Sequence, residues 1–266
     1  MMIVKVPGIH AFGKTQGCRQ SDNAVISELR KIRSNEKGKL IDVNLLNIEE
    51  THVNNENLEE QDNLIYNSSK EKFKTQDKVL FLGGDHSISY STGRAFLEVN
   101  NKKEKESCLI VFDAHADCDD TMKEPSHEEW LRALIERGFP AENILLVGVR
   151  EMSQNEVKFL SEKGIKRISI NQIEENIQEM ADVITEFAHG KELYVSLDID
   201  VVDPAFALST NHPVAGGLTS RQMIYLVQRI ALMKNLRGFD IVEIDSEKDK
   251  DGRTVGLGAR IVAELL

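Results

Sequence analysis

The sequence predicts an α/β fold in three layers, in which a mostly parallel sheet of eight strands lies between two layers of helices. Two observations lead to this prediction. Short apolar segments alternate with longer amphipathic segments along the 266 residues, which is typical of strands that alternate with helices. Several short segments, such as Leu109–Phe112, are apolar throughout, as expected for strands that are buried on both faces of a parallel sheet.

The expected strands are the eight short apolar runs. In chain order they are Met2–Val6, Lys39–Leu45, Lys78–Leu82, Cys108–Phe112, Asn143–Val147, Arg167–Ile170, Leu193–Leu197 and Leu236–Val242. The expected helices lie between them and are Asn23–Arg33, Glu56–Lys74, His127–Gly138, Gln154–Gly164, Ile173–His189, Ser220–Lys234 and Val255–Leu265. The helix from His127 has the clearest ends, because Ser126 and Glu129 match a capping box and Gly138 suits a helix C-terminus. Nothing marks a domain boundary, so we expect residues 1–266 to form a single domain.

Charge and composition disfavour several classes of protein. The net charge is -11, whereas a nucleic-acid binder usually has a basic face. Cys18, Cys108 and Cys118 form no CxxC pair, which argues against a disulfide framework or a thiolate zinc site and fits a reducing compartment. No apolar run approaches the roughly 18 residues of a membrane span, and the N-terminus lacks a signal-peptide pattern. We therefore expect a soluble cytoplasmic protein with neither nucleic acid nor membrane as a partner.

Three segments share one design, in which carboxylates and a histidine follow an apolar strand. The segments are Gly83–Ser87 after Val79–Leu82, Asp113–Asp117 after Leu109–Phe112, and Asp198–Pro204 after Leu193–Leu197. Because alternate residues of an extended chain point to the same side, Asp113, His115 and Asp117 can project together, and so can Asp198 and Asp200. All three segments lie at the carboxyl ends of their strands, which is the edge where open α/β sheets bind ligands.

So much negative charge at one buried edge is costly without a counter-charge, which metal ions supply. Four aspartates and two histidines suit hard divalent ions such as Mn²⁺. Six ligands exceed the needs of one tetrahedral ion, and bridging carboxylates would hold two ions about 3.5–4 Å apart. Aspartates that merely cap strand-end turns are the alternative, which explains one such motif better than three.

The GGDHS, DAHAD and SLDIDVVDP segments resemble the three metal-binding motifs of the arginase–agmatinase family, the ureohydrolases. The resemblance runs from Val79 to Glu243, and more weakly from Val6 to Leu29. It implies an arginase-like fold with two manganese ions per chain. By position, the implied ligands of one ion are His86, Asp113, Asp117 and Asp198, and those of the other are Asp113, His115, Asp198 and Asp200, with Asp113 and Asp198 bridging.

The resemblance also implies three catalytic roles in the hydrolysis of a guanidino C–N bond, which releases urea. Glu243 resembles the glutamate that pairs with the guanidinium group, a planar cation that prefers a bidentate partner. His127 resembles the histidine that passes a proton to the leaving amine, and it follows Asp117 by ten residues, as in the agmatinase branch. Asp117 would orient the nucleophile. The expected substrate is a small cationic guanidino compound.

Several positions depart from the family's pattern. Glu128 replaces the usual Gly after the histidine, and Asn211-His212 departs from a Thr-Gly-Thr-Pro segment. His212 could lie at the rim of the pocket or in an exposed loop. The Cys118–Ser126 loop is shorter than in arginases, and Ser153 stands where they have an Asp. These departures weaken arginine as the substrate and leave agmatine, other guanidino acids and formimidoylglutamate open.

Two rival classes share this architecture. One is an amidohydrolase of the deacetylase type with one zinc ion, although both His86 and His115 count against it. The other is a non-catalytic regulatory relative, which the unusual loops at Asp119–His127 and Asn211–His212 favour and the six retained ligands disfavour. The family resemblance further implies a homo-oligomer, either a trimer or a hexamer.

Overall fold

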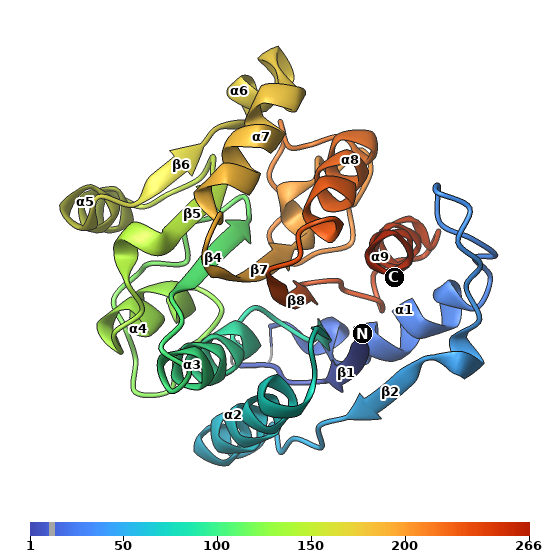
Figure 1. Ribbon diagram of the computed structural model, residues 1–266, viewed down its shortest axis with the longest axis horizontal. Helices are drawn as coiled ribbons and strands as arrows, with labels where there is room; N and C mark the ends of the chain where they lie inside the picture. The colour runs from blue at the N-terminus through green and yellow to red at the C-terminus, as the bar shows by residue number, and fades with distance from the viewer. Residues whose placement is uncertain (11–13) are drawn as a thin grey trace.

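The computed structural model describes residues 1–10 and 14–266. Its centre is an eight-stranded sheet with the order β2-β1-β3-β8-β7-β4-β5-β6, in which every neighbouring pair is parallel (Figure 1). The strands are β1 (Met2–Val6), β2 (Asn47–Glu50), β3 (Val79–Gly83), β4 (Ser107–Phe112), β5 (Ile144–Val147), β6 (Lys166–Ile168), β7 (Glu192–Asp198) and β8 (Leu236–Val242). The predicted fold class is confirmed, with a sheet that is parallel throughout.

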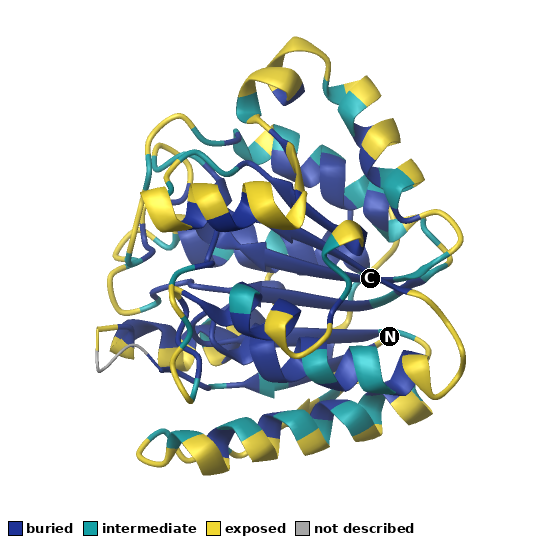
Figure 2. Ribbon diagram, turned by 90° about the vertical axis from the view of Figure 1, so that its left-hand side faces the viewer, coloured by how far each residue is buried: buried dark blue, intermediate teal, exposed yellow. Residues whose placement is uncertain are grey.

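Helices cover both faces of the sheet. They are α1 (Ser21–Leu29), α2 (Leu58–Thr75), α3 (Ile88–Asn101), α4 (Trp130–Glu136), α5 (Gln154–Lys163), α6 (Ile170–Glu175), α7 (Ile177–Phe187), α8 (Ser220–Ala231) and α9 (Arg253–Leu265). Buried side chains of α2 to α5 form one core against the sheet, and those of α1 and α6 to α9 form the other. Figure 2 shows the strands buried between helices whose outer faces are exposed.

Alternate residues of the central strands contribute side chains to the two cores on opposite faces of the sheet. In β4, Leu109 and Val111 belong to the core under α2 to α5, whereas Ile110 and Phe112 belong to the other. Strands with two buried faces need apolar residues at every position, which is the pattern that identified β4 in the sequence. The central strands are therefore firmly held, and their carboxyl ends form a rigid base for the loops that follow.

The strand expected at Lys39–Leu45 is wrong. Leu40 makes only an isolated antiparallel bridge with Ser34, and Val43–Leu45 is a short 3₁₀ turn that the Asp42 side chain caps. The strand at this edge of the sheet is instead β2, with the sequence Asn-Ile-Glu-Glu and almost no buried surface. An edge strand facing solvent needs no apolar pattern, so hydrophobic runs pointed to the wrong segment.

The expected helices also differ in three places. Helix α3 was not predicted, because its sequence is rich in Ser, Thr and Gly; Gly93 lets α3 approach α4 closely, since a Cβ there would lie 2.8 Å from Leu134 Cδ2. The single helix expected over Ile173–His189 is two helices, because Asn176 ends α6 and caps α7. The helix expected from His127 begins at Trp130, after a turn over residues 127–129.

Within residues 1–10 and 14–266, the structure contains no helix that is both long enough and apolar enough to cross a membrane.

Candidate metal centre

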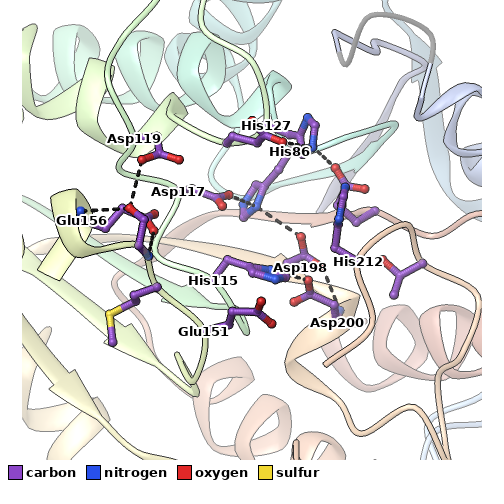
Figure 3. Close-up of a pocket in the computed structure, with 15 residues that line it drawn as sticks. His86, His115, Asp117, Asp119, His127, Glu151, Glu156, Asp198, Asp200 and His212 are labelled. Atoms are coloured by element: carbon purple, nitrogen blue, oxygen red, sulfur yellow. Dashed lines mark hydrogen bonds and ion pairs between the residues drawn. The ribbon is translucent and has the colours of Figure 1, made fainter. Parts of the chain in front are cut away.

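The carboxyl ends of four adjacent strands bring the predicted site residues together. Strands β3, β8, β7 and β4 are neighbours in the sheet. His86 follows β3, Asp113 to Asp117 follow β4, Asp198 ends β7, and Asp200 lies in the 3₁₀ turn after it. Glu243 directly follows β8. All six side chains that the sequence indicated as metal ligands converge at this edge. Figure 3 shows five of them, His86, His115, Asp117, Asp198 and Asp200.

His86 lies at the centre of three carboxylates. Its Nδ1 is 3.1 Å from Asp113 Oδ2, 2.9 Å from Asp117 Oδ2 and 3.4 Å from Asp198 Oδ2, and the ring is fully buried. Burial disfavours the imidazolium form, but the three carboxylates outweigh it and raise the pKa of His86 well above its usual value. One imidazole edge thus faces the negative charge of three side chains from two different strands.

Asp113 also faces a second histidine. Its Oδ1 is 3.6 Å from His115 Nδ1, which lies 2.9 Å from Asp200 Oδ2. Although burial opposes the charged ring, the hydrogen bonds to Asp113 and Asp200 raise the pKa of His115 to about 12. Two groups, His86 with Asp113 and Asp117, and Asp113 with His115 and Asp200, each have ligand atoms within 4.8 Å of one another. Asp113 therefore belongs to two adjacent groups of side chains that could each hold a metal ion.

The chemistry of these residues fits divalent cations. Among the described residues, His86 Nδ1 and Asp113 Oδ2 are buried and have no hydrogen-bond partner of good geometry. Burial raises the pKa of Asp117, and the charge of Asp113 adds to that effect. Burial likewise raises the pKa of Asp198, where Asp200 contributes next. Buried carboxylates that repel one another are stabilised by a cation, and an oxygen-rich set with imidazole suits a hard divalent ion.

A second layer of hydrogen bonds fixes the candidate ligands. His86 Nε2 lies 2.9 Å from Ser196 Oγ, which donates to Asp240 Oδ1 at 2.7 Å. Trp130 donates its indole N–H to Asp117 Oδ2 at 2.8 Å. Partners of this kind set the orientation of a ligating histidine or carboxylate. The sequence analysis did not identify Ser196 or Trp130 as partners of the candidate ligands. Two signals were available: Ser196 precedes Asp198 by two residues in β7, and Trp130 is the sole tryptophan.

Glu243 lies beside this centre in a constrained conformation. Its φ is 62°, its backbone N–H donates to Gly84 O at 2.9 Å, and its Oε1 accepts from the His86 backbone N–H at 2.9 Å. The other oxygen accepts from Asn211 Nδ2 at 3.3 Å. Burial, and then the charge of Asp85, raise the pKa of Glu243 to about 7. The carboxylate is thus fixed in place and has spare acceptor capacity toward the cavity that it lines.

Asp85, within the GGDHS motif, is a further buried residue of the site that the sequence analysis did not assign a role. Its Oδ2 accepts from the His10 backbone N–H at 2.6 Å and from Thr15 Oγ1 at 2.7 Å. Asp85 therefore holds both ends of the N-terminal loop against the site; the residues between, 11–13, lie outside the described part of the chain. The buried carboxylate itself is the signal that could have identified this role, since such a group requires partners.

His127 and His212 lie together on the other side of the cavity. Their rings stack with centroids 5.5 Å apart and planes at 23°, and the His212 ring meets His115 edge-on at 6.2 Å. His127 is 7% exposed. Burial opposes protonation of His127, but Glu243 and other nearby carboxylates raise its pKa above the usual value. His212 is exposed and also lines the rim of the pocket, so the two positions that the sequence left open coincide.

The cavity has a volume of about 400 Å³ and an acidic rim (Figure 3). Five of the six candidate metal ligands, all but Asp113, line it, and so do the carboxylates of Asp119, Glu128, Glu151 and Glu156. Asp119 accepts from Ser153 Oγ at 3.1 Å. Glu156 accepts from the backbone N–H of Cys118 at 3.0 Å and from that of Ser153, the N-cap of α5, at 2.7 Å. Glu128 and Glu151 are exposed. Over the described residues, neither lysine nor arginine lines this cavity.

Comparisons with known proteins agree with this geometry. The chain is 34% identical over 188 residues to agmatinase from Bacillus subtilis, an alignment that covers 70% of this chain and 61% of the relative. It is 33% identical over 195 residues to the mitochondrial arginase 1 of Arabidopsis thaliana, covering 71% of this chain and 54% of the relative. The chain therefore spans less than two thirds of the length of these relatives.

A solved structure and a family profile extend the match to the whole chain. Proclavaminate amidino hydrolase from Streptomyces clavuligerus superimposes with a TM-score of 0.88 at 25% identity, over 99% of this chain and 89% of that one. The profile described as Arginase family matches residues 1–266. Together with the strand-end carboxylates and histidines, these matches show that the chain belongs to the Arginase family.

Proposed function

We propose that this chain is a binuclear manganese hydrolase that cleaves a guanidino C–N bond and releases urea. The observation that carries the proposal is the convergence of four aspartates and two histidines, in which Asp113 faces both His86 and His115. His86 Nδ1 and Asp113 Oδ2 lie 3.1 Å apart as an ion pair, but neither atom makes a hydrogen bond of good geometry within the described residues. Metal coordination would satisfy both.

The side chains around the centre have different roles in hydrolysis. When bound, two divalent ions would make a water molecule more acidic and stabilise negative charge at the reacting carbon. Asp117 has Oδ2 held by Trp130, which leaves Oδ1 to orient the attacking water. Glu243 holds the guanidinium group, because a fixed carboxylate can accept two parallel N–H bonds. His127, with two buried ring nitrogens that lack hydrogen-bond partners in the described structure, delivers a proton to the departing amine.

The rim of the pocket favours a substrate that carries a second positive charge. The exposed carboxylates of Glu128 and Glu151 line the opening, and a cationic tail would be attracted there. A carboxylate tail, as in arginine or a guanidino acid, would meet like charge without a lysine or arginine partner among the described lining residues. We therefore propose a guanidine with an amine tail, of the agmatine type, as the substrate.

A substrate panel tests the reaction and the tail together. Urea release would be measured with the manganese-loaded protein on agmatine, arginine, guanidinobutyrate, guanidinopropionate and free guanidine, and formamide release on formimidoylglutamate. We expect the highest kcat/KM for agmatine. A preference for arginine or a guanidino acid would refute the role of the rim, and no urea from any guanidine would refute the function itself.

Metal content separates this function from its rivals. We expect two manganese ions per chain, whereas one zinc ion would favour the deacetylase type. Asp113→Asn and Asp198→Asn should lose metal and activity together, while the matched control Glu174→Gln, on the exposed face of α6, should keep both. Full activity in either aspartate variant would contradict a two-metal centre.

We also propose a homo-oligomer, a trimer or a hexamer, which sedimentation analysis of the manganese-loaded protein would test.

A further inference from the structure

Two positions that set this sequence apart from its family lie next to each other in the structure. Glu128 follows His127 in the turn over residues 127–129, and His212 lies in a loop more than 80 residues later in the chain. Both side chains are exposed, and both line the mouth of the cavity. Glu128 and His212 therefore alter the same part of the pocket mouth, where both lie close to His127.

The three side chains present metal-ligating atoms to a common point. His127, Glu128 and His212 each have a ring nitrogen or carboxylate oxygen within 4.8 Å of the others. His127 Nε2 is 3.8 Å from Glu128 Oε1, too far for a hydrogen bond. The rings of His127 and His212 are stacked 5.5 Å apart. The contacts are thus close enough to form a cluster but do not satisfy its polar atoms.

His127 provides an independent indication that something binds here. The residue is 7% exposed, yet neither Nδ1 nor Nε2 has a hydrogen-bond partner in the described part of the chain. Buried imidazole nitrogens are normally hydrogen-bonded, because leaving them unsatisfied costs about 1–3 kcal/mol. A ligand in the cluster would satisfy one of them.

We propose that His127, Glu128 and His212 form a third cation site, selective for zinc, at the mouth of the pocket. Two imidazoles and one carboxylate are a ligand set that binds Zn²⁺ and leaves the fourth position to water. The set is also softer than the aspartate-rich centre below, so the two places prefer different metals. Because Glu128 and His212 are exposed, their side chains can move the short distance that tetrahedral coordination requires.

Zinc at this site would act on turnover, a consequence that rests on the proposed function. The ion would occupy a ring nitrogen of His127 and so remove the group that passes a proton to the leaving amine. It would also neutralise Glu128 and narrow the entrance for a cationic tail. Micromolar zinc should therefore slow urea release without extracting manganese.

Metal counting tests the site without reference to turnover. The manganese-loaded protein would be titrated with Zn²⁺, and bound zinc and manganese would be measured by elemental analysis after desalting. We expect one additional zinc per chain with the manganese retained. In His212→Ala and Glu128→Gln, zinc affinity should fall by at least about 100-fold, since loss of even an outer partner of a metal ligand costs 10–100-fold. Both residues are exposed, so both variants should fold.

The rim residue Glu151 supplies the matched control. It is an exposed carboxylate that lines the same cavity but lies outside the cluster, so Glu151→Gln should bind zinc as the unaltered protein does. No additional zinc, zinc bound only in exchange for manganese, or equal zinc affinity in His212→Ala would each overturn the proposal. Zinc binding without any urea release would leave this site standing and refute only the hydrolase function.

Discussion

Replacing Ser196 by alanine should weaken metal binding although Ser196 is not itself a candidate ligand. The hydroxyl is fully buried and lies between His86 Nε2, at 2.9 Å, and Asp240 Oδ1, at 2.7 Å. If His86 Nδ1 binds a metal, Nε2 carries the proton and donates to Ser196, which in turn donates to Asp240. This relay fixes the tautomer and the direction of the ring.

The size of the effect follows from the role of such partners. Loss of an outer partner of a ligating histidine typically costs 10–100-fold in metal affinity, which corresponds to about 1.4–2.8 kcal/mol. The same substitution removes buried hydrogen bonds, so the metal-free protein should also lose about 1–3 kcal/mol of unfolding free energy. Stability loss alone would therefore be an ambiguous result.

Ser89→Ala separates the two effects. Ser89 is equally buried and donates to the other oxygen of the same carboxylate, Asp240 Oδ2, at 2.8 Å. Its hydroxyl lies 3.3 Å from Ser196 Oγ, and only its backbone N–H, which the substitution keeps, bonds to His86, at the carbonyl oxygen. Both variants should lose comparable stability in the presence of EDTA. Manganese titration against a chelating indicator should show weaker binding only for Ser196→Ala. Unchanged affinity in Ser196→Ala, or an equal loss in Ser89→Ala, would refute the relay.

Three further substitutions test other parts of the structure. Hydrogen bonds from Arg221 lower the pKa of Glu36 from 4.5 to about 2, so Glu36 stabilises the fold above about pH 4.5, and this contribution is lost as the pH falls toward 2. Glu36→Gln should therefore flatten the pH–stability curve between these values in thermal melts. An unaltered curve would contradict the pairing. Gly84→Ala would place a Cβ 2.0 Å from Gly8 O, and urea denaturation should show a loss of about 1–3 kcal/mol; a neutral result would mean that the N-terminal loop yields freely. Asp117 has a φ of 49°, a backbone conformation that Asn tolerates better than Ala. In urea denaturation without metal, Asp117→Asn should therefore be more stable than Asp117→Ala by about 1–2 kcal/mol. Equal stability would contradict backbone strain at this position.

The sequence predicted the central part of the fold better than its edges, for a physical reason. Strands β3, β4, β7 and β8 are buried on both faces, so most of their residues are apolar, apart from buried polar residues such as Ser196 and Asp240. Strand β2 faces solvent and carries two glutamates. The exposed leucines lie outside it, Leu40 in an isolated bridge and Leu45 in a 3₁₀ turn. Hydrophobic patterns report burial, and they report secondary structure only where the two coincide.

The site was predictable wherever chemistry requires particular residue types at short spacing. Asp113, His115 and Asp117 face one site, as their spacing indicated, but not through the extended backbone on which that prediction rested. The chain bends after β4, and Asp117 has a φ of 49°. The partners that support them come from distant segments: Trp130 begins α4, and Asn211 reaches Glu243 from the loop after β7. Only the folded arrangement identifies such partners, because neither residue has a local pattern that distinguishes it from a packing or loop residue.

Backbone strain in this protein is concentrated where function is proposed. In the described residues, Glu104, Asp117 and Glu243 are the non-glycine positions with positive φ, and two of them line the cavity. Such conformations cost of order 1–3 kcal/mol and persist only where the surroundings hold them. Hydrogen bonds with Gly84 and His86 hold Glu243, and Trp130 holds Asp117. Both residues follow a central strand, β4 or β8, and both side chains line the cavity. Glu128 and His212, in contrast, lie on exposed turns outside this held framework. We therefore infer that the centre itself tolerates little change, whereas the mouth of the pocket can acquire new ligands at little cost in stability.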